Sequence, residues 1–210
     1  MDNEALTRQR QYATVCFVPG RKSPSERQPQ RASKTREDWL RAAAKALEKA
    51  GPAGVRVEAL ARQLSVTKGS FYWHFEDRQA LLLGLLDTWE ALGTSDIITR
   101  VEARGGDPRA QLLRLWDITS HASMGPELAI RDWARGDERA RQRVQRVDQR
   151  RLAYLAGKFR ALGFSPAQSE QRSLLLYSLL IGAYFIQTGH DEPAREKLLL
   201  QTVKRILEPV

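Results

Sequence analysis

The chain has 210 residues, of which 42% are hydrophobic, so it can bury a core as one large domain or as two smaller ones. Its 34 Lys and Arg exceed its 25 Asp and Glu, and the resulting net charge of +9 favours a polyanionic partner such as nucleic acid or an anionic membrane. One cysteine, Cys16, excludes an internal disulfide, and with only three histidines we expect no metal site and no cofactor.

Residues 1–34 are polar and basic, without a sustained apolar period, and predict a flexible N-terminal arm that carries Cys16. A leader without a partner is the simpler interpretation of this arm, and an arm lying along DNA is the alternative. The arm contains no apolar run of signal-peptide length, and the apolar stretch near Leu174 to Ile186 is too short to cross a membrane. We therefore expect a soluble protein of the cytoplasm.

Residues 35–78 predict three short helices packed as a small domain. Thr35 and Asp38 have the spacing of a capping box, and Gly51-Pro52 ends the first helix. The second helix runs from Glu58 to about Leu64, and the third runs from Lys68 to Phe75. Helix, tight turn and helix in this order are typical of a DNA-binding helix-turn-helix.

Residues 79–210 predict a second, larger helical domain. Asp77 begins a long helix that runs toward Thr99. Further helix starts are marked by a proline, glycine or aspartate: Asp107-Pro108, Gly125-Pro126, Gly136-Asp137, Ser165-Pro166 and Asp191. The sequence therefore predicts an all-α protein of about nine helices, with an N-terminal three-helix head and a C-terminal bundle.

The helix from Lys68 to Phe75 has one face suited to a core and one suited to DNA. Phe71 and Phe75 are four residues apart and face inward, whereas Thr67 is placed to cap the helix. The outward positions carry groups that suit phosphates, sugars and base edges: Lys68, Ser70, Tyr72, Trp73 and His74. A surface cluster of aromatic residues without a partner is the alternative interpretation.

The run Val57 to Ala61, followed by a turn and by Gly69 to Phe75, resembles the DNA-binding head of the TetR family of bacterial transcriptional regulators. The resemblance covers roughly Thr35 to Trp89. It implies that Lys68, Ser70, Tyr72, Trp73 and His74 lie at DNA, and that the protein associates with the nucleoid when bound. It also implies phosphate contacts from neighbouring helix starts: Thr35, Arg36, Arg56 and Arg78.

Two positions depart from the family pattern. The turn residue that is often glycine is Ser65, which must adopt a left-handed backbone at a cost of about 1 kcal/mol. The position that often caps the second helix with Thr or Ser is Arg56, so the cap must come from elsewhere or be lost.

The resemblance implies that the bundle binds a small-molecule effector and forms a dimer through its last two helices. Ser173 to Gln187 is apolar around most of its circumference, so it needs cover on both sides. A central helix covered entirely by its own chain is the alternative. The expected interface residues come from the last two helices: Leu176, Leu179, Leu180, Ala183, Leu199 and Val203.

Residues that combine an apolar body with a polar tip suit a small-molecule pocket. The candidates in the bundle are Trp116, His121, Met124, Trp133, Tyr154 and Tyr177. For each one alone, an ordinary core residue is the simpler interpretation. The family resemblance implies that a bound effector would move the long helix after Asp77 and so change the separation of the heads.

The function that we expect is a dimeric, ligand-responsive repressor that binds a palindromic operator. No nucleophile elbow, phosphate loop or His-Glu-x-x-His pair is present, so an enzyme is not expected. The remaining alternative is an adaptor, or a protein that binds nucleic acid without sequence preference and has no effector. Sequence-selective DNA binding separates the two.

Overall fold

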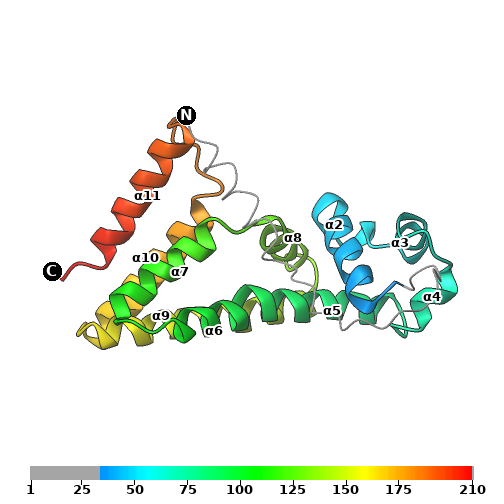
Figure 1. Cartoon of the computed structure of the whole chain (residues 1–210), viewed down its shortest axis with the longest axis horizontal. Helices are drawn as coiled ribbons and strands as arrows, with labels where there is room; N and C mark the ends of the chain where they lie inside the picture. The colour runs from blue at the N-terminus through cyan, green and yellow to red at the C-terminus, as the bar shows by residue number, and fades with distance from the viewer. Residues whose placement is uncertain (1–33, 210) are drawn as a thin grey trace, which may run out of the picture. The chain divides into compact units, whose positions relative to one another are not determined.

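The computed structural model describes residues 34–209, so the predicted arm with Cys16 lies outside them except for Lys34. Over this range the chain contains α-helices and one π-helical segment, and no strand (Figure 1). The α-helices α5 and α6 are joined through the π segment without a break, so the prediction of about nine helices is confirmed. None of the helices in residues 34–209 is long and apolar enough to cross a membrane.

The described residues form two compact units. The first contains residues 34–93 together with Ser123–Val144, and the second contains Thr94–Ala122 together with residues 145–209. The predicted division into domains at residue 78 concerns function and stays a prediction.

The first unit begins with α2 (Arg36–Gly54), which opens on the predicted capping box. The Thr35 hydroxyl accepts from the Asp38 N–H at 3.2 Å, and the Asp38 carboxylate accepts from the Thr35 N–H at 3.0 Å. The helix is kinked near its end, where Gly51 has a φ of 61°. The other helices of this unit are α3 (Val57–Gln63), α4 (Lys68–Tyr72), α5 (Arg78–Glu90) and α8 (Gly125–Trp133).

The helices of this unit pack around α2, which contacts α3, α5 and α8. Trp39 is fully buried and meets Phe71 edge to face, with 5.2 Å between the ring centroids. The backbones of α2 and α5 come close at Gly84, because a Cβ there would lie 3.1 Å from the side chains of Arg36 and Leu40. This close approach holds the head helices against the start of the long helix.

A buried carboxylate connects α5 with α8. Glu127 is 7% exposed, and its Oε2 accepts from the Trp89 indole N–H at 2.8 Å. Its Oε1 accepts from the Arg131 guanidinium at 2.7 Å. Because a buried polar group is tolerated only with partners, these two donors satisfy the Glu127 carboxylate inside the unit.

The second unit contains the rest of the helices. They are α6 (Asp96–Ala103), α7 (Pro108–Ser120), α10 (Pro166–Gly182), α11 (Glu192–Ile206) and the last part of α9 (Glu138–Ala161), with the π segment Ala91–Ser95 preceding α6. Asp107, Ser165 and Asp191 cap α7, α10 and α11, each by accepting a backbone N–H in the first turn. The three predicted helix starts are confirmed.

The core of the second unit is an apolar cluster between α7, α9, α10 and α11. It includes Leu112, Phe159, Leu176 and Val203, each at most 4% exposed. The end of α11 is fixed by two arginines, because Arg109 donates to the Leu207 carbonyl at 3.0 Å and Arg172 donates to the Ile206 carbonyl. These bonds satisfy carbonyls that have no partner within the helix.

Three expected helix features differ in the structure. The third helix ends at Tyr72 instead of Phe75, and α10 ends at Gly182 instead of Gln187. Thr67 does occupy the N-cap position of α4, but its side chain makes no capping hydrogen bond, so the expected hydroxyl cap is wrong. The backbone N–H of Ser70 bonds instead to the Thr67 carbonyl at 3.1 Å, which closes the first turn without the hydroxyl.

Candidate nucleic-acid interface

The turn between α3 and α4 is a Schellman motif with serine in its left-handed position. Ser65 has a φ of 58°, as the sequence predicts. The Ser65 N–H donates to the Arg62 carbonyl at 3.1 Å, and the Val66 N–H donates to the Ala61 carbonyl at 3.0 Å. These two bonds stop α3 and turn the chain into α4, and they offset part of the strain at Ser65.

The inner face of α4 fixes how the helix is rotated. Phe71 is fully buried and Phe75 is 4% exposed, and their rings stack with 5.5 Å between centroids. Because these two rings are locked inside, the residues between them must point away from the core. Tyr72 is 55% exposed and Trp73 is 87% exposed, which makes Trp73 an unusually open tryptophan.

The leading edge of α4 carries an exposed cation beside these aromatic side chains. The Lys68 ammonium lies 2.6 Å from the Glu58 carboxylate of α3. Their hydrogen bond is the main cause that raises the pKa of Lys68 and lowers the pKa of Glu58, so each stays charged. Next to it, Gly69 lies in the open, and a Cβ there would approach only the Thr67 hydroxyl, at 3.7 Å.

The other predicted contact residues differ in the exposure and in the bonding of their side chains. Arg56 and Thr67 are exposed, whereas Ser70 and His74 are half-buried beside the exposed part of α4. Arg56 stands at the N-cap of α3 without a side-chain bond to the helix, so that cap is lost. Thr35 is occupied by its capping box with Asp38.

Two predicted phosphate-binding arginines have partners within the protein. Arg36 lies over the Phe75 ring, with its guanidinium carbon 4.9 Å from the centroid. Arg78 donates through Nε to the Val55 carbonyl at 2.7 Å and through Nη2 to the Pro52 carbonyl. Arg78 therefore holds the connection between α2 and α3 in place.

The six residues expected to bind a ligand are divided between the two units. Met124 and Trp133 belong to the first unit, and the other four belong to the second. Tyr177 donates to Asp148 at 2.7 Å, and Tyr154 donates to Glu102 at 2.6 Å. Burial, then the bond to Glu102, raises the pKa of Tyr154 far above its usual value, so its hydroxyl stays protonated and donates.

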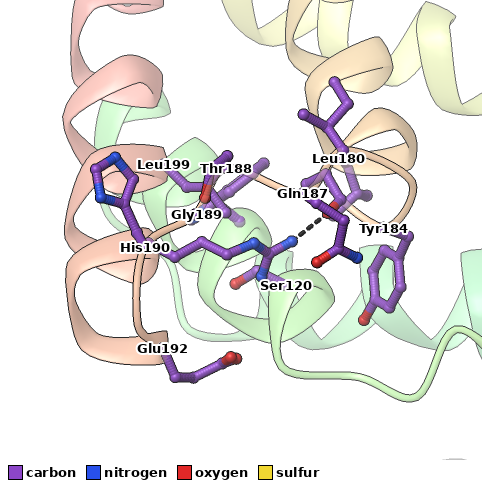
Figure 2. Close-up of a pocket in the computed structure, with 13 residues that line it drawn as sticks. Ser120, Leu180, Tyr184, Gln187, Thr188, Gly189, His190, Glu192 and Leu199 are labelled. Carbon is purple, nitrogen blue, oxygen red and sulfur yellow. Dashed lines mark hydrogen bonds between the residues drawn. The ribbon is translucent and has the colours of Figure 1, made fainter.

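The second unit contains a cavity of about 510 Å³ beside the end of α10 (Figure 2). One of the six predicted ligand-binding residues, Trp116, lines it. Sequence reasoning missed Tyr184 and Arg195, which also line it. The polar run after the apolar helix, Gln187 to His190, was a signal for a loop at this place, but it gave no indication of a pocket.

The residues expected at a dimer interface are divided between the core and its edge. Leu176 and Val203 are buried within their own chain, at 4% and 0% exposure. The rest are half-buried: Leu179, Leu180, Ala183 and Leu199. The large apolar side chains exposed on and after α10 and on α11 are others: Leu174, Leu175, Tyr184, Phe185, Ile186, Leu198 and Leu200.

Residues 40–85 match the sequence model of a family described as "Bacterial regulatory proteins, tetR family". The chain carries a TetR-family DNA-binding domain. Because the proteins of this family are transcription factors, the chain is a DNA-binding transcriptional regulator and not an enzyme. A comparison with curated proteins gives no significant match.

Solved structures share the TetR fold over most of the chain. The Streptomyces coelicolor TetR-family regulator SCO4454 superposes with a TM-score of 0.69 at 18% identity, over 82% of this chain and 93% of its own. Reduced Escherichia coli NemR gives 0.69 at 21% identity, over 84% and 100%. A transcriptional regulator from Saccharomonospora viridis in complex with choline gives 0.65 at 16%, over 82% and 94%. At these identities the likeness concerns the fold alone.

Proposed function

We propose that this TetR-family protein is a cytoplasmic, ligand-responsive repressor that binds a palindromic operator as a dimer. The observation that carries the proposal is the rotation of α4. Two buried rings, Phe71 and Phe75, force Tyr72 and Trp73 outward beside the exposed Lys68. A cation next to two open aromatic side chains on one short helix suits a major groove, where phosphates, sugars and thymine methyl groups lie close together.

Lys68 and Arg56 supply the phosphate contacts in this proposal. Lys68 is held by Glu58 in the free protein, and a phosphate oxygen would replace that carboxylate as its partner. Arg56 has an exposed side chain at the start of α3. From there it contacts the phosphates of the DNA backbone beside the groove. Arg78 and Arg36 support DNA binding indirectly, by stabilising the head, because both side chains already contact neighbouring residues of the head.

The contacts that depend on the operator sequence come from three residues of α4 and its end: Tyr72, Trp73 and His74. The Tyr72 hydroxyl and the His74 ring donate to phosphate or base edges, and the Trp73 ring packs on a sugar or a thymine methyl. Ser70 and Thr67 lie at the start of the same helix and can approach the DNA closely, because Gly69 between them adds no side chain.

A dimer would cover the exposed apolar face formed by Leu174, Leu175, Leu198 and Leu200. Monomeric proteins rarely leave so many large apolar side chains open on neighbouring helices, and α10 and α11 are in contact. The half-buried Leu179 and Ala183 would border this face, whereas Leu176 and Val203 support it from within. A twofold pair of heads then reads two half-sites about 34–36 Å apart.

The response to a ligand has support in the fold and in one relative. The S. viridis regulator shares this fold and holds choline. Small-molecule pockets are commonly found between the helices of bundles, and the second unit of this chain has such a cavity.

An adaptor function is the second candidate, because an open tryptophan such as Trp73 also suits a protein partner.

The test of the proposed function is equilibrium binding of the protein to a DNA duplex selected from random sequence. Trp73→Ala and Lys68→Gln should each weaken binding at least tenfold. The matched controls, Phe185→Ala and Lys197→Gln, change an exposed ring and an exposed lysine of the second unit and should change binding less than twofold. Equal effects of the test and control substitutions would contradict the proposal.

A further inference from the structure

The cavity of the second unit lies between the end of α7, the end of α10 and the start of α11. Its volume of about 510 Å³ is within the usual range for small-molecule sites. Figure 2 shows the connection from Gln187 to His190 running across it, with Tyr184 on the side of Gln187 and His190 on the other side. The residues come from three segments that are far apart in the sequence, so the cavity exists only in the folded unit.

One part of the cavity wall is apolar. Trp116 is 7% exposed and presents its indole from α7. Leu180 of α10 and Leu199 of α11 are half-buried and complete this side. An aliphatic chain or a flat ring placed here would bury apolar surface against all three helices.

Arg195 supplies a positive charge to the cavity wall. This half-buried side chain donates one N–H to the Ala183 carbonyl at the end of α10. A guanidinium has five N–H donors, so others remain for a ligand. Glu192 also borders the cavity, and Figure 2 shows it apart from Leu180 and Gln187. A carboxylate is the group whose geometry matches a guanidinium with two parallel hydrogen bonds.

Three polar contacts between segments hold this cavity open in its present form. The Tyr184 hydroxyl donates to the Ala122 carbonyl at 3.0 Å. The His121 ring nitrogen Nε2 lies 2.6 Å from a Glu196 oxygen, which joins α7 to α11. The Arg195 bond to Ala183 joins α11 to α10. A site whose walls are fixed before binding loses little entropy when a ligand enters.

We propose that this cavity binds a small amphipathic carboxylate, with its anionic group on Arg195 and its apolar body against Trp116, Leu180 and Leu199. The ligand is the effector of the regulator, so this inference rests on the proposed function for its biological role, although not for binding itself. The cavity includes the exposed Ile186, which follows α10, one of the two helices of the proposed dimer interface. Occupancy can therefore alter the arrangement of the two subunits.

The test uses three probes that share one aliphatic tail: decanoate, 1-decanol and decyltrimethylammonium, each below its micelle concentration. Calorimetric titration of the full-length wild-type protein should give at least tenfold tighter binding of decanoate than of the other two. Equal binding of all three, tighter binding of the cation or no binding of decanoate would overturn the proposal. This comparison needs no variant, so it stands whether or not a variant folds.

Two variants locate the site. Arg195→Gln should reduce decanoate affinity at least tenfold, to the level of decanol, with an unchanged circular dichroism spectrum. Arg205→Gln removes an exposed arginine of the same helix and should leave decanoate affinity within twofold. Equal affinities of the two variants for decanoate would place the anionic group elsewhere.

Operator binding, measured separately, distinguishes failure of the ligand-site proposal from failure of the proposed function. Selective DNA binding without decanoate binding refutes only the ligand site. Decanoate binding without selective DNA binding refutes only the proposed regulator function.

Discussion

The buried carboxylate of Glu127 gives a stability prediction whose size follows from its partners. Glu127→Leu removes the acceptor of the buried Trp89 indole N–H, and the loss of this hydrogen bond costs about 1–3 kcal/mol. Arg131 loses a charged partner as well, but it is 24% exposed and can turn toward water, which limits that loss to about 1 kcal/mol.

The expected total is a loss of about 2–4 kcal/mol in the free energy of unfolding. For a chain of this size that corresponds to a Tm lower by about 4–16 °C. Thermal unfolding at fixed protein concentration measures it. The matched control is Glu170→Leu on α10, where the glutamate is exposed, and it should change stability by less than about 0.5 kcal/mol.

A double-mutant cycle isolates the bond between Trp89 and Glu127. Trp89→Phe alone removes the donor and leaves the carboxylate with one partner fewer, so it should also destabilise the protein. Once Glu127 is leucine, the same Trp89→Phe change should cost about 1–2 kcal/mol less. A coupling energy below about 0.3 kcal/mol would refute the reasoning that this bond connects α5 with α8.

Three further predictions concern the turn, the DNA surface and pH. Ser65→Gly relieves a left-handed serine and should raise the free energy of unfolding by up to about 1 kcal/mol in urea denaturation, and a loss would contradict the strain. Lys68→Gln should lower the slope of log affinity against log salt by about 1.8 for two heads, whereas Arg78→Gln should mainly lower the Tm; the reverse pattern would exchange their roles. Burial opposes the charge of His121, but its bonds to the Asp117 carbonyl and Glu196 outweigh burial and raise its pKa above 6.5. The stabilisation from His121 is therefore complete below about pH 6.5 and is lost as pH rises through the raised pKa, so His121→Gln should lower the Tm more at pH 5.5 than at pH 9, and equal losses would contradict it.

Local features of the head could be predicted because they depend on neighbouring residues. The capping box of Thr35, the left-handed backbone of Ser65 and the buried faces of Phe71 and Phe75 all follow from spacings of four residues or fewer. The missing hydroxyl cap of Thr67 could not be predicted, since a closed first turn with a carbonyl acceptor is an equally good local solution.

The bundle could be predicted less well, because its sequence leaves the rotation of α10 undefined. Apolar residues surround this helix, so no polar side marks the outward direction. The structure turns Leu176 inward and leaves Leu174 and Leu175 more than half exposed. The cavity was beyond sequence reasoning for another reason: Trp116, Leu180 and Arg195 meet only through the packing of three helices.

The most direct test of the account is selection of binding sites from random duplex DNA with the purified protein, followed by titration of the selected duplex against a scrambled one at fixed salt. The account predicts an inverted repeat with half-site centres one helical turn or a multiple apart, bound by two or more subunits at least about 10³-fold more tightly than scrambled DNA. Salt-sensitive binding without sequence preference would contradict it and would favour an adaptor or a nonspecific clamp.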